Sequence, residues 1–549
     1  MADTPTLADR LPRDVKALRA LLRDEHDARK GELGREWWRI VRDAYQGTGG
    51  FARSLRAAST WSPRQGSLEW PRITRRDTYL VPFSRESAES FAGRADRSAY
   101  DNHVAPVVDV YHGHLSRRPP KRAAPDGGAV AAWWPDVTGT GCDIDEWMGA
   151  TRLRAQLDGW CAVLVDRTTD ATSHTATRVC RLDPDEVLDW QFARDGSLDW
   201  IRLGSSWEEC DPATDVETEV EEFTLWTRTG WARVRLERVE TEGQARSEDE
   251  GWTVTITGDA HDLGRVPVEV LRWQEPLDGG CLYGTPQVYG VVAQNVALFN
   301  NESEYAHHLA NANFAPLTVQ SDDDTALNNL ALGTNNGMRY PIGAERPGFI
   351  APPSDVAIQY ALRSEQIIRA IYTAAKVQRP QADASGGDAA SGIAKAYDFA
   401  QTDAVLQGFV RQCAKFEYGL VDLVLRWASP GRDVRAELAA ITIDYPTRFD
   451  ARGIQEDLGA HFAVLDEKIR AQFPPEVIRQ ARLAITRMLF PEAADTTIAL
   501  ATSQIDEMAK AEADALAGAA STALVGAAID ALPPPAAPDA NTIPMTAAQ

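Results

Sequence analysis

The stretch SGIAKAYDFAQTDAVLQGFVRQCAKFEYGLVDLVLRWAS, residues 391–429, decides the fold of this chain. Its apolar residues recur every three or four positions, which predicts one continuous amphipathic helix. The residues that hold this spacing are Val405, Phe409, Cys413, Phe416, Leu420, Val424 and Trp427. At ~1.5 Å per residue the helix is about 58 Å long, whereas helices of globular proteins average ~11–12 residues. A helix of this length favours a subunit of a large assembly over a compact enzyme.

The segments before this helix form an ordered series. Thr285-Pro286 is a capping residue followed by proline, and it predicts a helix over 285–312. Residues 313–352 hold two short strand-like pieces among turn residues, and Ser354 can cap a second helix that ends at 377. The composition of QRPQADASGGDAAS, residues 378–391, predicts a flexible loop. The series is therefore helix, small insert, helix, loop and very long helix.

The rest of the chain combines helices with a β-rich region. Residues 160–275 alternate apolar and polar side chains between turns such as Asp195-Gly196, as half-buried antiparallel strands do. The stretch ITIDYPTRF, residues 441–449, predicts one strand that returns to this β region. Residues 452–512 have a helical pattern, and the Ala/Pro-rich tail from 513 predicts disorder. The fold class is therefore α+β.

Length and charge limit the possible functions. A chain of 549 residues is long enough for several packed regions. Its formal net charge is −23, with 57 Lys/Arg against 80 Asp/Glu. Residues 1–122 hold 23 Lys/Arg and 16 Asp/Glu, or +7, so the remainder carries −30. A mostly acidic body disfavours tight wrapping of nucleic acid, which needs a basic surface, and it suits a surface that DNA passes without sticking.

Targeting and cysteine patterns point to assembly in a cytoplasm. The start MADTPTLADRLPRDVK lacks the apolar core of a signal peptide, and no run approaches the ~18 apolar residues of a membrane span. The six cysteines are scattered without a C-x-x-C pair, which favours buried free thiols in a reducing compartment. We expect no membrane association.

Motifs for catalysis are missing from the sequence. The nearest match to a phosphate-binding loop, Gly387 to Gly392, is followed by Ile393 instead of the lysine that must reach the phosphates. No G-x-S-x-G or H-E-x-x-H motif occurs. Adjacent histidines such as His307-His308 point about 100° apart on a helix and cannot easily share a metal. We therefore expect no catalytic residue, no cofactor and no metal site.

Six stretches in this order resemble the portal proteins of tailed bacteriophages. Together they cover roughly residues 100–430, and their order is more specific than any one of them. The stretches are NHVAPVVDVYHGHLSRRPP (102–120), LDGWCAVLVDR (157–167), LDPDEVLDWQFARDGSLDWIRLG (182–204), LGRVPVEVLRW (263–273), VVAQNVALFNNESEYAHHLANANFAPLTVQ (291–320) and SGIAKAYDF (391–399).

This resemblance implies a ring, typically a dodecamer, at one capsid vertex of the virion. Such a ring is the channel for packaging, retention and ejection of double-stranded DNA, which passes without sequence-specific recognition. The implied partners are further copies of the chain, the terminase large subunit that hydrolyses ATP, a head–tail adaptor, and the major capsid and scaffolding proteins. The chain itself needs no catalytic residue for this role.

The resemblance also divides the chain. The implied parts are the wing (1–284), two stem helices (285–312 and 353–377), the clip (313–352), the tunnel loop (378–391), the long helix with the returning wing strand (392–450), the crown (451–512) and the disordered tail (513–549). The short clip without tryptophan and a crown without a familiar motif depart from better-known portals.

Three groups of residues form the predicted sites. Sparse channel cations on the second stem helix are Arg363, Arg369 and Lys376, for which salt bridges to neighbouring subunits are the alternative role. The tunnel loop contributes Arg379, Asp383, Gly386, Gly387 and Asp388; its glycines allow a change of shape and its carboxylates hold phosphates off, although the composition also fits a solvated connector. The clip residues for docking of partner proteins are Arg339, Glu345, Arg346 and Phe349.

Two other functions remain open at the level of sequence. The first is another structural component of a phage particle, a connector or minor capsid protein, although these are usually shorter and lack the helical series. The second is an enzyme that acts on polysaccharide or nucleic acid with the β region as its core. The sixteen tryptophans fit a carbohydrate platform, but most fall at predicted strand and helix positions, where core packing explains them.

Overall fold

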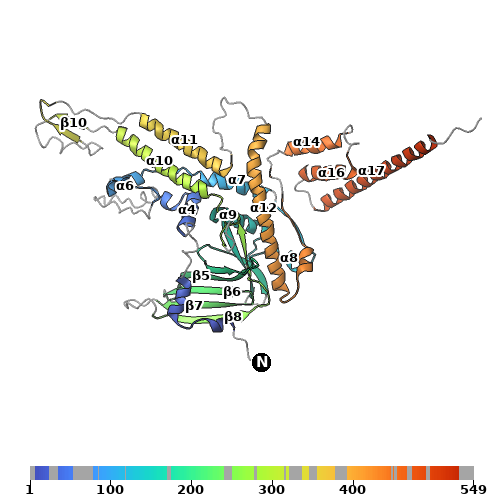
Figure 1. Cartoon of the computed structure of the whole chain (residues 1–549), viewed down its shortest axis with the longest axis horizontal. Coiled ribbons are helices and arrows are strands. Elements are labelled where there is room, and N and C mark those ends of the chain that lie inside the picture. Colours follow the sequence, from blue (N-terminus) through green and yellow to red (C-terminus); the bar gives the residue numbers. More distant parts are fainter. Residues whose placement is uncertain are drawn as a thin grey trace, which may run out of the picture. The chain divides into compact units, whose positions relative to one another are not determined.

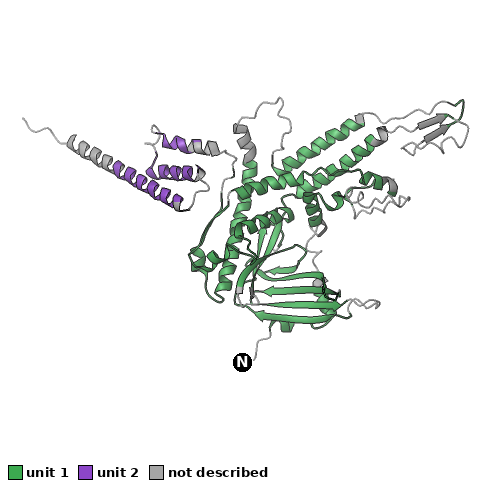
Figure 2. Cartoon of the chain, turned by 180° about the vertical axis from the view of Figure 1, so that it is seen from behind, with its two compact units in different colours: residues 1–449 green, residues 450–549 purple. Residues whose placement is uncertain are grey.

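Long helices combine with small β-sheets in this computed structural model, so the fold is mixed α+β (Figure 1). The structure describes residues 6–23, 35–52, 78–84, 86–117, 119–169, 175–214, 216–239, 250–276, 281–313, 317–320, 337–344, 355–377, 392–446, 449, 454–466, 473–489 and 495–530. The chain divides into two compact units, residues 1–449 and 450–549 (Figure 2). The division falls next to residue 451, where the sequence places the start of the crown.

Unit 1 contains the sheets and the longest helices of the predicted series. Its helical segments are α1 (Leu7–Arg10), α2 (Val15–Arg23), α4 (Arg35–Gln46), η2 (Gly49–Phe51), α6 (Ala88–Ala95), α7 (Val104–Arg117), α8 (Ala129–Trp133), α9 (Ile144–Asp158), α10 (Tyr289–Asn313), α11 (Asp355–Ala375), α12 (Gly392–Ala428) and α13 (Arg435–Ala439). Its strands are β1 (Lys121–Ala123), β2 (Trp160–Thr169), β3 (Thr175–Leu182), β4 (Val187–Phe192), β5 (Leu198–Cys210), β6 (Glu217–Thr227), β7 (Gly230–Val239), β8 (Thr253–Ala260), β9 (Val268–Arg272), β10 (Leu317–Gln320), β11 (Gly337–Tyr340) and β12 (Thr442–Asp444).

The β-rich region forms two antiparallel sheets. Strands β3, β2 and β9 form a three-stranded sheet with β2 at its centre, and β4 to β8 follow one another in a five-stranded meander. Three tryptophans join these sheets to α4 by packing around Tyr283. The ring centroids of Trp38, Trp160 and Trp190 lie 5.4, 4.7 and 5.0 Å from that of Tyr283. These tryptophans are therefore core residues, as the strand pattern favours.

Helix α9 is buried against β2 and α7, and the sequence did not predict it. Its N-terminus is capped by Asp143, whose carboxylate accepts the backbone N–H of Glu146 at 2.9 Å. It ends at Gly159, whose φ of 84° lies in the left-handed region. A Cβ at Gly159 would lie 2.4 Å from the carbonyl oxygen of Gly284, so this close approach requires glycine.

The very long helix is α12, which has 37 residues over Gly392–Ala428 and confirms the predicted bounds closely. Its buried side packs against β9, α8 and α7, and the apolar residues at its 3/4 spacing, such as Phe409, Cys413 and Phe416, are 2% exposed or less. The strand after it was predicted to return to the β-rich region, which is wrong. β12 pairs instead with β1, a strand of three residues that precedes the β-rich region in the sequence.

Unit 2 is helical, with α14 (Ile454–Leu465), α16 (Pro475–Leu489) and α17 (Asp495–Asp530). Two ion pairs join α16 to α17, Arg479 to Asp506 at 2.6 Å and Arg482 to Glu512 at 2.8 Å. The prediction of disorder from residue 513 is wrong up to Asp530, because α17 continues to that residue. Alanine is the strongest helix former, so an alanine-rich stretch extends a helix until prolines interrupt it, and these begin only at 533. The rest of the predicted tail, 531–549, lies outside the described residues.

Candidate functional site

Helices α10 and α11 lie side by side as a helical hairpin that projects away from the sheets of unit 1 (Figures 1 and 2). Hydrogen bonds join the two helices near the middle of α10. The amide of Asn301 donates to the carbonyl oxygen of Tyr360 at 3.2 Å and to the hydroxyl of Ser364 at 2.8 Å, and that hydroxyl donates to Glu302. The rings of Tyr305 and Tyr360 stack with centroids 6.0 Å apart. These polar contacts therefore fix the register of the two helices, in addition to their apolar packing.

Buried polar side chains fix α10 to the N-terminal helices. Asn295 is fully buried, accepts the N–H of His103 at 2.9 Å and donates to the carbonyl oxygen of Asp101 at 2.9 Å. Arg94, with a side chain 1% exposed, binds Glu86 at 2.8 and 2.9 Å and the hydroxyl of Ser303 at 3.0 Å. Burial raises the pKa of Glu86, but hydrogen bonds from Arg94 and the Phe83 N–H outweigh it, so the pKa lies below its ordinary value.

The end of α11 closes in an unusual way. Val377 N–H donates to Tyr372 O and Lys376 N–H to Thr373 O, both at 3.1 Å, which is the Schellman arrangement. Its left-handed position, normally glycine, is Lys376 with φ 54°. Two side chains bind the last carbonyls, Tyr111 of α7 at Ala375 O (2.8 Å) and Thr402 of α12 at Lys376 O (2.5 Å). The end of α11 is thus fixed to both α7 and α12.

The three predicted cations on the second stem helix, Arg363, Arg369 and Lys376, are all exposed. None of them forms an ion pair within the part of the chain that the structure describes. Arg363 and Arg369 are six positions apart, so on a helix their side chains point roughly 120° apart. The structure therefore does not place the two arginines on one face.

Two exposed faces of α11 differ in character. Ile358 and Leu362 are 56% and 51% exposed, and Arg369 follows on the same face at helical spacing. We call these three residues the apolar face of α11. The adjacent polar face consists of Gln359, Arg363 and Gln366, all exposed. The sequence pattern alone did not separate these two exposed faces. Their separation requires knowing which face of α11 is buried against α10.

Most residues of the other two predicted sites cannot be placed. The tunnel-loop residues Arg379, Asp383, Gly386, Gly387 and Asp388 lie outside the described residues, as do the clip residues Glu345, Arg346 and Phe349. Arg339 lies in β11, opposite Val319 of β10 in a short parallel pair between α10 and α11 in the sequence. The small insert thus contains the two strands that its sequence predicts.

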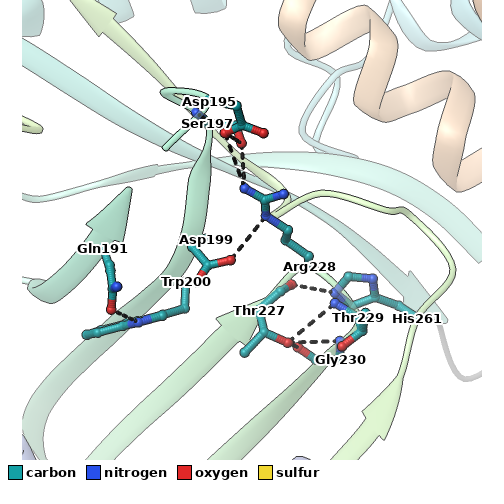
Figure 3. Close-up of polar contacts among 10 residues, drawn as sticks. All are labelled: Gln191, Asp195, Ser197, Asp199, Trp200, Thr227, Arg228, Thr229, Gly230 and His261. Carbon is teal, nitrogen blue, oxygen red and sulfur yellow. Dashed lines mark hydrogen bonds and ion pairs between the residues drawn. The ribbon is translucent and has the colours of Figure 1, made fainter. Parts of the chain in front are cut away.

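A second polar group, which the sequence did not predict, lies at one end of the five-stranded sheet (Figure 3). Arg228 donates to the hydroxyl of Ser197 at 2.6 Å and forms ion pairs with Asp195 at 3.4 Å and Asp199 at 3.2 Å. His261 binds the carbonyl oxygen of Thr227 through Nε2 at 3.1 Å, while its Nδ1 accepts the N–H of Leu263 at 3.4 Å. Burial lowers the pKa of His261, so its ring is neutral near pH 7 and both nitrogens are occupied.

A cavity of about 490 Å³ opens beside Arg228 and reaches the surface of α12. Its charged wall residues bind one another. Arg265 pairs with Glu269 and with Asp422 at 2.9 Å, and Lys415 lies 3.4 Å from Glu275. Burial raises the pKa of Glu269 despite the adjacent arginine. Because these charges are paired and His261 is occupied, the group fastens the sheet and β9 to α12 and offers no nucleophile with a free base.

Among the described residues, no group of three or more His, Cys, Asp or Glu side chains has the geometry to hold a metal ion. Within the same ranges, no helix combines the length and apolar character needed to cross a bilayer. His112 and His114 of α7 are partly buried, and burial lowers the pKa of each.

Comparison with known proteins gives no family. No protein-family model matches the chain, and no curated protein is similar to it.

Proposed function

We propose that this chain is the subunit of a portal ring, the channel through which DNA enters and leaves a phage capsid. The observation that carries the proposal is the helical hairpin α10/α11, with a small insert between its helices, followed after residues 378–391 by the 37-residue helix α12. The portal fold, as the sequence resemblance implies it, has this order of stem, clip, stem, tunnel loop and long helix.

The two exposed faces of α11 support distinct roles in such a ring. The apolar face, Ile358 and Leu362 with Arg369, suits contact with the next subunit, because exposed apolar side chains at helical spacing gain from burial. The polar face, Gln359, Arg363 and Gln366, suits a water-filled channel. We therefore assign Arg363 to the channel wall and Arg369 to the subunit contact.

The charge of the hairpin fits the passage of DNA. Residues 289–313 and 355–377 hold three cations, Arg363, Arg369 and Lys376, against the carboxylates Glu302, Glu304, Asp355 and Glu365, which gives −1. Strong phosphate contacts would slow a sliding polyanion, whereas a nearly neutral to acidic wall keeps it mobile. A few cations repeated around a ring would centre the DNA without holding it.

Native mass measurement combined with negative-stain imaging tests the proposal. A heterologous contact repeated around an axis closes into a ring when the rotation permits, so we expect one closed species, typically of twelve subunits, with a central hole. Only monomers and dimers at micromolar concentration would contradict the proposal. A compact particle without a hole would instead favour another structural component or an enzyme.

A further inference from the structure

A cavity of about 470 Å³ between α7 and α9 contains a buried charge without a partner. Arg152 of α9 lines this cavity and is 4% exposed. Its Nε is buried without a hydrogen bond, and no described carboxylate forms an ion pair with the guanidinium. Arginine stays protonated in proteins, so this side chain cannot escape the cost of burial by losing its proton.

Two acidic residues of this region, Glu417 and Asp145, are already engaged. Glu417 of α12 is fully buried, but its carboxylate accepts hydrogen bonds from Arg122 and, at 2.6 Å, from the hydroxyl of Tyr445. Asp145 forms its ion pair with Arg122 at 2.7 Å. Arg122 thus has two carboxylates and Arg152 has none. Uncompensated buried charges are strongly destabilising, so folded proteins rarely keep one without a counter-ion.

Two further polar groups face the same cavity from α7. His112 has a buried Nδ1 without a hydrogen-bond partner, while its Nε2 lies 3.5 Å from the hydroxyl of Ser116. Burial lowers the pKa of His112, and the charge of Arg152 lowers it further. A neutral imidazole can place its N–H on Nδ1; its Nε2 then accepts the hydroxyl proton of Ser116, so the wall offers a guanidinium and an imidazole N–H as donors.

The charges that line the cavity differ in their exposure to solvent. Asp145 and Glu146 also line it, but both are exposed, whereas Arg152 is buried. Solvent screens the carboxylates far more than the buried cation. A ligand with two or more oxygens can bind the guanidinium in the bidentate manner that carboxylates and phosphates adopt.

We propose that this cavity is a binding site for a small oxyanion of the carboxylate or phosphate class, held by Arg152 and His112, with Ser116 fixing the tautomer of His112. The cavity volume lies within the ~300–1,000 Å³ of small-molecule sites. The site is independent of the portal proposal, since none of its residues belongs to the hairpin or the tunnel loop.

Thermal unfolding of the full chain, with inorganic phosphate or acetate as probe and chloride at matched ionic strength as reference, tests the site. A ligand that binds only the folded state raises its stability by mass action. We expect at least one probe to raise the Tm of the wild type and of the control Arg117→Met, an exposed cation on α7, but not that of Arg152→Met. Equal shifts in all three proteins, or none in the wild type, would overturn the proposal.

The same variants give a second readout without ligand. In chloride buffer without phosphate or carboxylate, Arg152→Met should unfold at the same temperature as the wild type or above it, because the substitution removes an unpaired buried charge. If Arg152→Met does not fold, titration of the wild type and His112→Ala decides. His112→Ala should weaken binding about tenfold, the effect of one hydrogen bond to a charged group. Absence of saturable binding to the wild type would then exclude the site.

Discussion

At the scale of single residues, Arg94 shows how the base of the hairpin is held. Its guanidinium lies between the rings of Phe83 and Phe91, 4.5 and 5.2 Å from their centroids, and binds Glu86 in a bidentate pair. Removing one partner of a buried pair leaves the other charged and desolvated. Arg94 therefore stabilises the fold mainly by compensating the buried charge of Glu86, and less by its contacts with the two rings.

We predict that Arg94→Met destabilises the protein by about 3–5 kcal/mol, the cost of an uncompensated buried carboxylate. Chemical denaturation at pH 7 measures this loss. Adding Glu86→Gln to the variant should recover part of the stability, since the amide carries no charge. Arg97→Met, at an exposed position just after α6, serves as the control. A loss of stability below 1 kcal/mol for Arg94→Met would show that the Glu86 carboxylate is hydrated in the variant.

Lys376 permits a second prediction at this scale. Its left-handed backbone costs a residue with a Cβ roughly 1–2 kcal/mol, and glycine avoids that cost but loses about 0.5–1 kcal/mol in backbone entropy. Lys376→Gly should therefore stabilise unit 1 by about 0.5–1 kcal/mol. Lys376→Ala should give no gain, because alanine keeps the Cβ. Equal Tm increases in both variants would show that the lysine side chain, and not its backbone, is unfavourable.

At the scale of elements, the two exposed faces of α11 allow a matched comparison. Leu362→Glu places a carboxylate on the apolar face, where a subunit contact would bury it. Gln366→Glu places the same carboxylate on the polar face. We predict that Leu362→Glu reduces ring formation at least tenfold in subunit concentration, as one buried unpaired charge would, while Gln366→Glu assembles normally. Native mass spectrometry over a concentration series measures both; equal behaviour would refute the assignment of the faces.

The long elements were predictable because each has one apolar side. α11 and α12 begin and end within one or two residues of their predicted bounds, and α10 begins at Tyr289, four residues after Thr285. α9 was missed because its buried residues include the polar side chains Thr151, Arg152 and Gln156, which interrupt the apolar pattern. The pairing of β1 with β12 joins three-residue strands that lie far apart in the sequence, 121–123 and 442–444, and are too short to carry a pattern.

The sites were predictable only in part. Exposure of Arg363 and Arg369 followed from their positions between the apolar residues of α11, but the division into two faces required the axis of the hairpin. The cavity at Arg152 could not be inferred from the sequence, because whether a buried charge has a partner depends on residues far away along the chain. For Arg152 such partners would come from α12, more than 250 positions further along the chain.

At the scale of the whole molecule, the proposed ring multiplies each charge of the tunnel loop. Changing Asp383 and Asp388 to Lys adds two cations per subunit, and each new phosphate contact steepens the salt dependence of DNA binding by about one unit. We predict impaired packaging at low salt that recovers as salt rises, with normal rings. The amount of DNA packaged per particle at two salt concentrations measures this effect.

The same charge changes at two exposed residues, Asp126 between β1 and α8 and Glu208 in β5, provide the control and should leave packaging unchanged. Wild-type packaging by the Asp383→Lys/Asp388→Lys variant at low salt would place the loop outside the channel.

The closure of α11 also has a mechanical consequence. The hairpin is a lever: α10 alone is about 37 Å long at ~1.5 Å per residue, and the end of α11 is clamped to α7 and α12 through Tyr111 and Thr402. A force at the far end of the hairpin acts through this long arm, whereas the hydrogen bonds at the end of α11 act over only a few ångströms. The force at α12 is therefore larger than the force applied at the far end, and the displacement at α12 is smaller.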